Sequence, residues 1–392
     1  MRAIGTISRG VRTPIIRTGD NLVEIVAQSV LAAAEEGKFA FNDRDVVGVT
    51  EAVLARAQGN YATIAQISAD VRAKFPTKEL GLVFPIMSRN RFSQILRGIA
   101  GAVDKLYIQL SYPSDEVGNP LVSIDLLDEK GINPFTDVLD EARFRELFDK
   151  VMHPFTGVDY IDYYKQLSEG KAEVILANDP RAILVYTSQV ICADIHSRAR
   201  SKRLLRQAGA ELVLGLDDIL TTPVDGSGYH PEFGLLGSNL ATENSVKLFP
   251  RDAQAFAEAL AARLFELTGK RLEALVYGDG AFKDPVGGIW ELADPVVSPG
   301  FTAGLLGTPR ELKLKYIADN ELGALSSADA TAKIKERIRQ KSESETTGMS
   351  AQGTTPRRFT DLLGSLCDLT SGSGDKGTPV ILIQGYFDTY AD

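Results

Sequence analysis

The chain has too few cysteines and too little continuous apolar sequence for several classes of protein. Cys192 and Cys367 are its two cysteines in 392 residues, which is too few for a disulfide framework or a cysteine-rich zinc site. No window approaches the roughly 18 apolar residues that a membrane helix needs. Residues 1–10 show no charged start followed by an apolar stretch. We therefore expect a reducing, cytoplasmic compartment and no membrane partner.

Basic residues are also outnumbered by acidic ones. The sequence has 43 Lys and Arg against 52 Asp and Glu, a formal net charge of −9. Such a chain has no general positive field with which to coat nucleic acid or an anionic membrane surface. We expect small molecules as its partners and no nucleic acid, and small anions stay open as ligands.

The common catalytic signatures are absent. We find no G-x-x-x-x-G-K-[ST] phosphate loop, no H-E-x-x-H, no paired C-x-x-C and no G-x-S-x-G elbow. His153, His196 and His230 stand in unrelated contexts, and a three-histidine metal site would need all of them to converge. The alternative is that they are surface or capping residues. This inventory favours catalysis by carboxylates.

The spacing of apolar residues indicates a mixed α/β protein. Residues 1–59 suggest strand, helix, strand, helix, with the first helix starting after Asn21. Later helical patterns cover 61–75, 89–104, 142–152, 196–207 and 251–268, and strand-like runs cover 80–84, 105–110, 172–177, 182–186, 211–216, 272–277 and 379–385. Residues 339–357 are polar and have little to bury, which predicts a mobile loop, either a plain connection or a lid.

Two glycine-containing segments could carry chemistry. Asp279 stands between two glycines after an apolar strand, where α/β sheets hold metal ligands and phosphates. There it could bind Mg²⁺ or Mn²⁺, while Lys283 offsets phosphate charge. The alternative is a tight Gly-Asp-Gly turn without a ligand. The second segment, residues 369–379, could form an anion-binding nest or a plain helix-to-strand loop.

A basic stripe is the third candidate. On a helix, Arg198, Lys202 and Arg206 would repeat every four residues along one edge. In an acidic protein such a stripe could attract an anionic substrate. The alternative is a solvated helix face paired with Asp and Glu.

Five blocks of sequence, in order, resemble those of the coenzyme F-420-0:γ-glutamyl ligases and cover about half of the chain. They are RTPIIRTGDNL (12–22), DRDVVGVTEAVLARAQG (43–59), FGLLGSNL (233–240) with LFPRD (248–252), LVYGDGAFKDP (275–285) and DLLGSLCDLTSGSGDKGTPVILIQG (361–385). The resemblance implies an α+β fold with a ligase-like core formed by 1–59 and 195–392. Residues 60–194 would then be an inserted α/β region.

The resemblance also implies an activity. A ligase of this family uses GTP with Mn²⁺ or Mg²⁺ to add L-glutamate to a carboxylate-bearing acceptor, and it forms a homodimer. The γ-phosphate of GTP would convert the acceptor carboxylate into an acyl phosphate, which the glutamate amine then attacks.

Individual residues carry over onto the family's motifs. Asp279 matches the metal-binding aspartate, and we assign catalytic roles to Asp279 and Lys283. Nucleotide contacts are implied for an N-terminal run, for Arg56 in place of a lysine, for Asn239 and for the C-terminal loop: Thr13, Pro14, Ile15, Ile16, then Ser371, Gly372, Ser373, Gly374, Asp375, Lys376, Gly377 and Thr378.

The sequence departs from the family pattern at several positions. Leu236 replaces a metal-binding aspartate, and an apolar side chain cannot ligate a hard cation. Glu51-Ala52 replaces a serine-lysine pair, Gly280 a threonine and Ser373 a glutamine. Another carboxylate would then complete the metal site, or the metal chemistry is altered; the candidates are Asp217, Asp218, Asp225 and Glu51.

Four functions therefore stay open. The first is the GTP-dependent ligase with an F-420-0-like acceptor, and the second is a folate-type polyglutamate ligase. The third is a non-catalytic nucleotide- or polyanion-binding protein derived from the ligase fold. The fourth is an ordinary α/β enzyme that uses another nucleotide, for which ATP would outcompete GTP.

Overall fold

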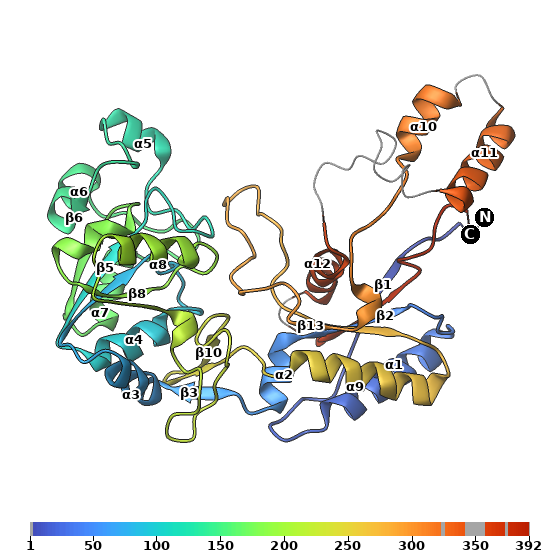
Figure 1. Cartoon of the computed structure of the whole chain (residues 1–392), viewed down its shortest axis with the longest axis horizontal. Helices are drawn as coiled ribbons and strands as arrows, with labels where there is room; N and C mark the ends of the chain where they lie inside the picture. The colour runs from blue at the N-terminus through green and yellow to red at the C-terminus, as the bar shows by residue number, and fades with distance from the viewer. Residues whose placement is uncertain (1–2, 323–325, 342–356, 373–374, 392) are drawn as a thin grey trace.

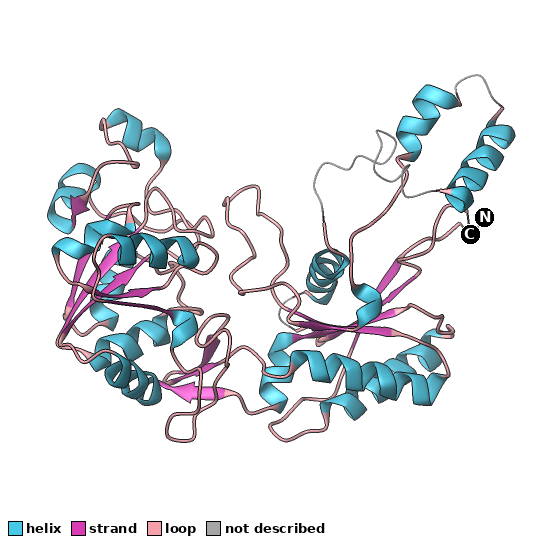
Figure 2. Cartoon of the chain, viewed as in Figure 1, coloured by secondary structure: helices cyan, strands magenta, loops and turns pink. Residues whose placement is uncertain are grey.

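The computed structural model describes residues 3–322, 326–341, 357–372 and 375–391. Within these residues the strands form three sheets, of five, three and six strands. The six-stranded sheet lies at one end of the molecule and the five-stranded sheet toward the other, with the small sheet between them (Figures 1 and 2).

The five-stranded sheet is built from both ends of the chain. Its order is β1-β14-β2-β12-β13, with β2 and β12 parallel and the other neighbouring pairs antiparallel. The strands are β1 (Ile7–Val11), β2 (Val46–Thr50), β12 (Glu273–Tyr277), β13 (Gly300–Phe301) and β14 (Val380–Gln384). Because β2 and β12 are parallel neighbours and β14 runs against β2, the ends of β2 and β12 and the start of β14 meet at one edge of the sheet.

Helices cover both faces of this sheet. Helices α1 (Leu22–Gly37) and α9 (Ala253–Thr268) bury one face, and α12 (Phe359–Ser371) packs on the other (Figure 1). Side chains alternate between the two faces along each strand. Val47 therefore packs against α1 and α9, and Val46 packs against α12. Gly48 is a glycine because a Cβ there would collide with the sulfur of Cys367 on α12.

The six-stranded sheet is mostly parallel. Its order is β6-β7-β5-β4-β8-β9, and only β6 runs antiparallel. The strands are β4 (Glu79–Val83), β5 (Lys105–Leu110), β6 (Leu139–Asp140), β7 (Ala172–Leu176), β8 (Gln189–Cys192) and β9 (Leu212–Gly215). The chain starts at β4, moves outward through β5 to β7, and returns to the other side of β4 with β8. The sheet therefore has a topological switch point between β4 and β8.

This sheet is also covered on both faces. One core packs it against α3 (Ile64–Lys74), α4 (Ser93–Ala102) and α7 (Tyr160–Leu167), and the other against α8 (Arg198–Gln207) and the 3-10 helix η1 (Pro180–Val185). The prediction of a strand at 182–186 is therefore wrong. Pro180 stands at the first helical position and the Asp179 carboxylate accepts the N–H of Arg181, which together start a helical turn.

The remaining elements connect the two large sheets or project from them. Helix α2 (Glu51–Ala57) leads into the three-stranded sheet, which contains β3 (Tyr61–Thr63), β10 (Asn239–Thr242) and β11 (Ser245–Lys247). Helices α5 (Ile124–Glu129) and α6 (Glu141–Phe148) extend the six-stranded side, and α10 (Leu314–Glu321) and α11 (Ser327–Gln340) project from the five-stranded side (Figure 1). Two 3-10 helices follow strands directly: η2 (Leu216–Asp218) follows β9, and η3 (Ala303–Leu305) follows β13.

Several predicted boundaries can be compared with this arrangement. The six-stranded sheet takes β9 from beyond residue 194, so the sheet does not end at the predicted limit of the inserted region. The division into 1–59, 60–194 and 195–392 stays a prediction. Of the predicted mobile loop, residues 339–340 belong to α11 and residues 342–356 lie outside the described residues. None of the helices described is long and apolar enough to cross a membrane.

Candidate active site

The candidate site lies at the edge where β2 and β12 end and β14 begins. Asp279 follows β12, Glu51 follows β2, and Thr378 precedes β14. The backbone joins these ends, because the Thr50 N–H donates to the carbonyl of Pro379 at 3.0 Å. Parallel strands that end at a common edge thus bring together segments more than 200 residues apart in sequence.

The two glycines around Asp279 allow a close approach of other carboxylates. A Cβ at Gly278 would collide with the Asp294 carboxylate, and one at Gly280 would lie 2.9 Å from Asp368 Oδ2. The carboxylates that enter this space accept backbone hydrogen bonds. Asp279 N donates to Asp294 Oδ2 and Gly280 N donates to Asp368 Oδ2, both at 2.8 Å. The Gly-Asp-Gly segment is therefore a turn whose backbone N–H groups bind the carboxylates of Asp294 and Asp368.

Arg91 closes this cluster from the other half of the molecule. It comes from the loop between β4 and α4, and its Nη2 lies 2.6 Å from both oxygens of Asp279. Its Nη1 lies 2.5 Å from Asp294 Oδ1. The Asp294 side chain is only 1% exposed, and those of Arg91 and Asp279 are 18% and 21% exposed. Nothing in the sequence of residues 84–92 indicated this contact.

Glu51 and Lys247 extend the cluster. Lys247 Nζ lies 3.6 Å from Glu51 Oε1, while Glu51 Oε2 is buried and has no hydrogen-bond partner among the described residues. Asn239 pairs with Lys247 across the β10–β11 ladder, which places this predicted nucleotide contact beside the cluster. Of the carboxylates considered as replacements at the site, Glu51 is the one that lies here.

Burial raises the pKa of two carboxylates in this cluster. It raises the pKa of Asp279 to about 7, with the charge of Asp294 acting in the same direction and Arg91 against it. It raises the pKa of Glu51 to about 7 as well, where Lys247 opposes the effect and Asp294 reinforces it. Four carboxylates, those of Glu51, Asp279, Asp294 and Asp368, face the two cations Arg91 and Lys247, so the cluster has a surplus of negative charge.

The arrangement does not fit a divalent cation. Both oxygens of Asp279 are occupied by Arg91, and Oδ2 also accepts the N–H of Ala293 at 3.1 Å. Leu236, at the position of the family's second aspartate, lines a cavity of about 20 Å³ together with Arg91. No group of three His, Cys, Asp or Glu in the described part of the chain is arranged to hold a metal ion. Arg91 thus brings positive charge to a place where the resemblance predicts a metal.

Several of the other predicted nucleotide contacts lie at the same end of the sheet, where β1 ends beside the start of β14. Thr13, Pro14 and Thr378 line one groove of about 920 Å³ between β1 and α1, and Arg12 Nε donates to the carbonyl of Lys376 at 3.3 Å. Ile15 is 79% exposed in the same segment, whereas Ile16 is buried in the core.

The C-terminal loop approaches the cluster through α12. Ser371 lies one turn after Asp368, and its carbonyl accepts the hydroxyl of Thr378 at 2.8 Å. Gly372, Asp375 and Gly377 belong to the same loop, and Ser373 and Gly374 lie outside the described residues. The Asp279 turn and the C-terminal loop therefore border the same region, because Asp368 on α12 accepts the N–H of Gly280.

Arg56 and Lys283 lie farther out. The Arg56 side chain is exposed near the end of α2, where the carbonyl of Arg56 accepts the Thr18 hydroxyl at 3.2 Å. Lys283 is exposed and pairs across a bridge with Trp290, its ammonium 5.7 Å from the centre of the indole ring. Neither touches the Asp279 cluster directly in the contacts described.

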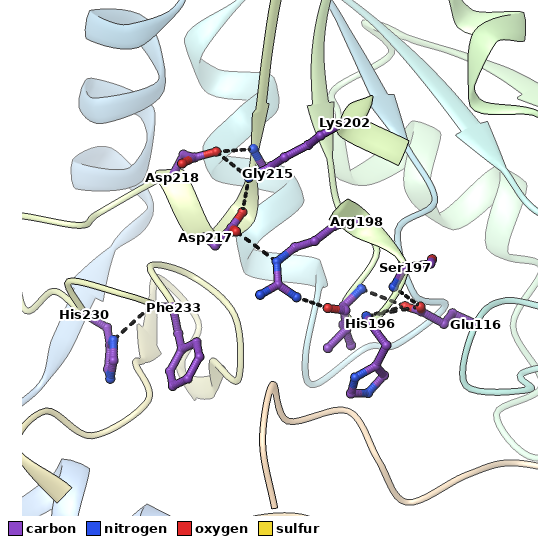
Figure 3. Close-up of polar contacts among 11 residues, drawn as sticks. Glu116, His196, Ser197, Arg198, Lys202, Gly215, Asp217, Asp218, His230 and Phe233 are labelled. Carbon is purple, nitrogen blue, oxygen red and sulfur yellow. Dashed lines mark hydrogen bonds and ion pairs between the residues drawn. The ribbon is translucent and has the colours of Figure 1, made fainter. Parts of the chain in front are cut away.

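The basic stripe belongs to a separate structure. Arg198 and Lys202 both pair with Asp217, at 2.9 and 2.7 Å, and Lys202 also pairs with Asp218 (Figure 3). Arg206 donates to the carbonyl of Val213. The stripe is thus a helix face that pairs with carboxylates, and Asp217 and Asp218 are not available to the Asp279 cluster.

The three histidines have separate structural environments. His230 Nδ1 accepts the N–H of Phe233 at 3.0 Å and so caps a turn, and burial lowers the pKa of His230 to about 4 (Figure 3). His196 contacts the carbonyl of Leu292 through Nε2 at 2.9 Å, and His153 packs edge-on against Tyr160.

Comparison with known proteins agrees with this fold. The sequence profile of the F420-0:gamma-glutamyl ligase family matches residues 10–385, nearly the whole chain. The protein belongs to this family of ligases. A search of curated proteins found no relative of the chain.

Proposed function

We propose that the chain is a GTP-dependent ligase that joins L-glutamate through an amide bond to the carboxylate of an acceptor. The observation that carries this proposal is the meeting of the Asp279 turn, the Glu51 end of β2 and the C-terminal loop at one sheet edge. Membership of the ligase family supports the class of reaction.

The reaction has two steps in this proposal. An oxygen of the acceptor carboxylate attacks the γ-phosphorus of GTP, the bond to the β-phosphate oxygen breaks, and GDP leaves. The glutamate amine then attacks the carbonyl carbon of the acyl phosphate, and inorganic phosphate leaves. The first step makes the carboxylate a good electrophile, and the second forms the amide bond.

The residues of the cluster would serve the second step. Its surplus of carboxylates attracts the ammonium group of glutamate, which must lose a proton before it attacks. Glu51 is suited to accept that proton because Oε2 is unpartnered and burial raises the pKa of Glu51 to about 7. Arg91 holds Asp279 and Asp294 in place and balances part of their charge.

The nucleotide would bind along the groove between β1 and α1 and the C-terminal loop. Thr13, Pro14 and Thr378 line this groove, and Arg56 on α2 is the phosphate contact that the resemblance implies. A metal ion is part of the prediction from the resemblance, but we derive no step through it because the Asp279 cluster does not fit one. The proposal also includes a homodimer in the cytoplasm.

The test supplies GTP, L-glutamate and candidate acceptors, alone and with Mn²⁺ or Mg²⁺. The expected result is a glutamyl adduct by mass spectrometry with one GDP and one phosphate released per adduct. Thermal shift should also rank GTP above ATP, since a ligand at 100 times its Kd stabilises the folded state by about 2.7 kcal/mol. A clear preference for ATP would contradict the nucleotide assignment.

A second function is favoured by one observation. Leu236 stands where the family pattern has a metal-binding aspartate, and Arg91 contacts both oxygens of Asp279, which the resemblance assigns to the metal. If GTP binds but no adduct forms under any metal condition, the chain is a nucleotide-binding protein that has lost the ligase chemistry.

A further inference from the structure

A separate pocket lies between the two halves of the molecule. It has a volume of about 220 Å³, and its walls come from the loop after β4 and from the segment after Asp279. Asp279 forms part of one wall, and the others include Arg89, Asn119, Tyr160 and Trp290. In Figure 1 the segment after β12 extends from the five-stranded side toward the six-stranded side. The pocket therefore joins the inserted region to the candidate site.

The position of the pocket follows from the order of strands. In open α/β sheets, ligands bind beyond the carboxyl ends of the strands at the switch point. Here that point lies between β4 and β8, and the loop that leaves β4 supplies both Arg89 and Arg91. Arg91 reaches the Asp279 cluster, and Arg89 lines the pocket.

A carboxylate of the chain itself occupies the start of α8, across the switch point from β4. Glu116 accepts the N–H groups of Ile195, His196 and Ser197, at 2.7, 3.1 and 2.6 Å, at the start of α8 (Figure 3). The loop after β4 contains no glycine between residues 84 and 92. The six-stranded sheet thus has the strand order of a nucleotide-binding fold, but the loop after β4 lacks the glycines of a phosphate-binding turn.

The Glu116 contact also fixes a wall of the pocket. The next residue, Val117, lines the pocket and its carbonyl accepts the N–H of Trp290 at 2.8 Å. Asn119, two residues further, lines the pocket too and is held by Asp115 at 2.7 Å. The wall that faces Asp279 is therefore tied to the start of α8.

The exposed side chains that line the pocket are those of Arg89, Asn90, Trp290 and Glu291, and two of them, Arg89 and Trp290, indicate the ligand. The Arg89 side chain is exposed, and its guanidinium has no hydrogen bond or ion pair with any described residue. Trp290, the single tryptophan of the chain, is 42% exposed. A guanidinium pairs with a carboxylate, and an exposed indole offers its face to a flat ring.

The size of the pocket limits the ligand further. Sites for drug-sized molecules have volumes of about 300–1,000 Å³, so a cavity of about 220 Å³ fits a smaller molecule. The described geometry suits an acid with one or two aromatic rings better than a larger polycyclic cofactor.

We propose that the inserted region supplies the acceptor pocket of this ligase and that the acceptor is a one- or two-ring aromatic acid. Its ring lies against Trp290 and its anionic group pairs with Arg89, beside Asp279. The ligand is an acceptor only if the proposed ligase function holds, and to that extent this inference rests on the proposed function. The pocket and the class of its ligand are tested by binding measurements alone.

Trp290 provides the readout, because it is the single tryptophan and lies in the pocket. We expect 4-hydroxybenzoate, added to the full chain, to change the tryptophan fluorescence saturably. Cyclohexanecarboxylate, which lacks the aromatic ring, and 4-hydroxybenzyl alcohol, which lacks the acid, should each bind at least tenfold more weakly. Calorimetry on the same samples checks the fluorescence titration.

Two arginine variants separate a specific site from general attraction of anions. In Arg89→Ala the half-saturation concentration for 4-hydroxybenzoate should rise at least tenfold. In Arg203→Ala, which removes an exposed arginine on α8 that hydrogen-bonds Gln207, it should not change. The inference is overturned if no saturable signal appears, if Arg89→Ala binds like the parent, or if the riboflavin monophosphate FMN, a three-ring anion, displaces the aromatic acid and binds more tightly.

Failure here is distinct from failure of the proposed function. A glutamyl adduct on an acceptor that does not perturb Trp290 would overturn the pocket and leave the ligase standing. Saturable, Arg89-dependent binding without any adduct would overturn the ligase and leave an aromatic-acid site.

Discussion

The guanidinium of Arg91 lies 2.6 Å from both carboxylate oxygens of Asp279, although the two residues belong to different sheets. Arg91 follows β4 of the six-stranded sheet, and Asp279 follows β12 of the five-stranded sheet. This ion pair therefore couples the six-stranded side of the molecule to the five-stranded side. It makes the loop after β4 a part of the candidate site.

Replacing Arg91 should destabilise the protein strongly. Arg91→Ala leaves Asp279 and the 1%-exposed Asp294 without their partner, and removing one member of a buried pair costs about 3–5 kcal/mol. Urea denaturation measures the free energy of unfolding. The matched control is Arg143→Ala, whose exposed pair with Glu146 should contribute less than about 1 kcal/mol. Equal effects of the two variants would contradict the assigned role of Arg91.

Asp279→Asn should abolish turnover while the fold persists. The amide keeps the size of the side chain and removes the charge that orients Arg91, so we expect the rate of adduct formation to fall about 10²-fold or more. Circular dichroism should show the secondary structure of the parent. An unchanged rate would remove Asp279 from the active site.

The raised pKa values of Asp279 and Glu51 should make the protein less stable as the pH rises through the acidic range. The pKa of Asp279 is about 7 in the folded chain against an ordinary value of 3.8, so between these values the folded chain binds more protons than the unfolded chain. The contribution of the protonated carboxyl is fully present below the ordinary value and is lost as the pH rises through the folded value. Glu51 acts in the same direction.

Denaturant titrations between pH 4 and pH 8 measure this effect. The decline in the free energy of unfolding should be shallower in Asp279→Asn than in the parent, because the amide does not titrate. Parallel profiles for the two proteins would show that the pKa of Asp279 is not raised.

Arg56→Ala should weaken nucleotide binding without affecting folding. The Arg56 side chain is exposed near the end of α2, so its removal leaves no cavity. A charge-assisted contact to phosphate contributes about 1.5–3 kcal/mol, which corresponds to a rise of about tenfold or more in the Kd for GTP. Calorimetric titration with GTP measures it, with Arg143→Ala as the control. Equal affinity in Arg56→Ala and the parent would reject the assignment.

Local patterns in the sequence predicted much of the fold correctly. The helix that starts after Asn21 is α1, and the Asn21 side chain caps it by accepting the N–H of Glu24. The predicted helix that ends at Gly269 is α9, where Gly269 adopts a left-handed conformation. Such signals depend on neighbouring residues, which is why one sequence suffices to find them.

Short elements were harder to predict. The four residues of β8 (Gln189–Cys192) were not identified as a strand, although β8 creates the switch point beside β4. A run of four residues has too little periodicity to reveal a strand, and β8 is stable because β4 and β9 pair with it on both sides.

The sequence by itself determined the ligase family, the order of its motifs and the placement of Asp279 after a buried strand. Only the tertiary structure decided which charges surround Asp279. Arg91, Asp294, Glu51 and Asp368 converge there because separate elements end at the same place, and no local pattern encodes a contact between residues nearly 200 positions apart. The same holds for Trp290 and Arg89, which share a pocket only because the segment after β12 folds back onto the carboxyl end of β4.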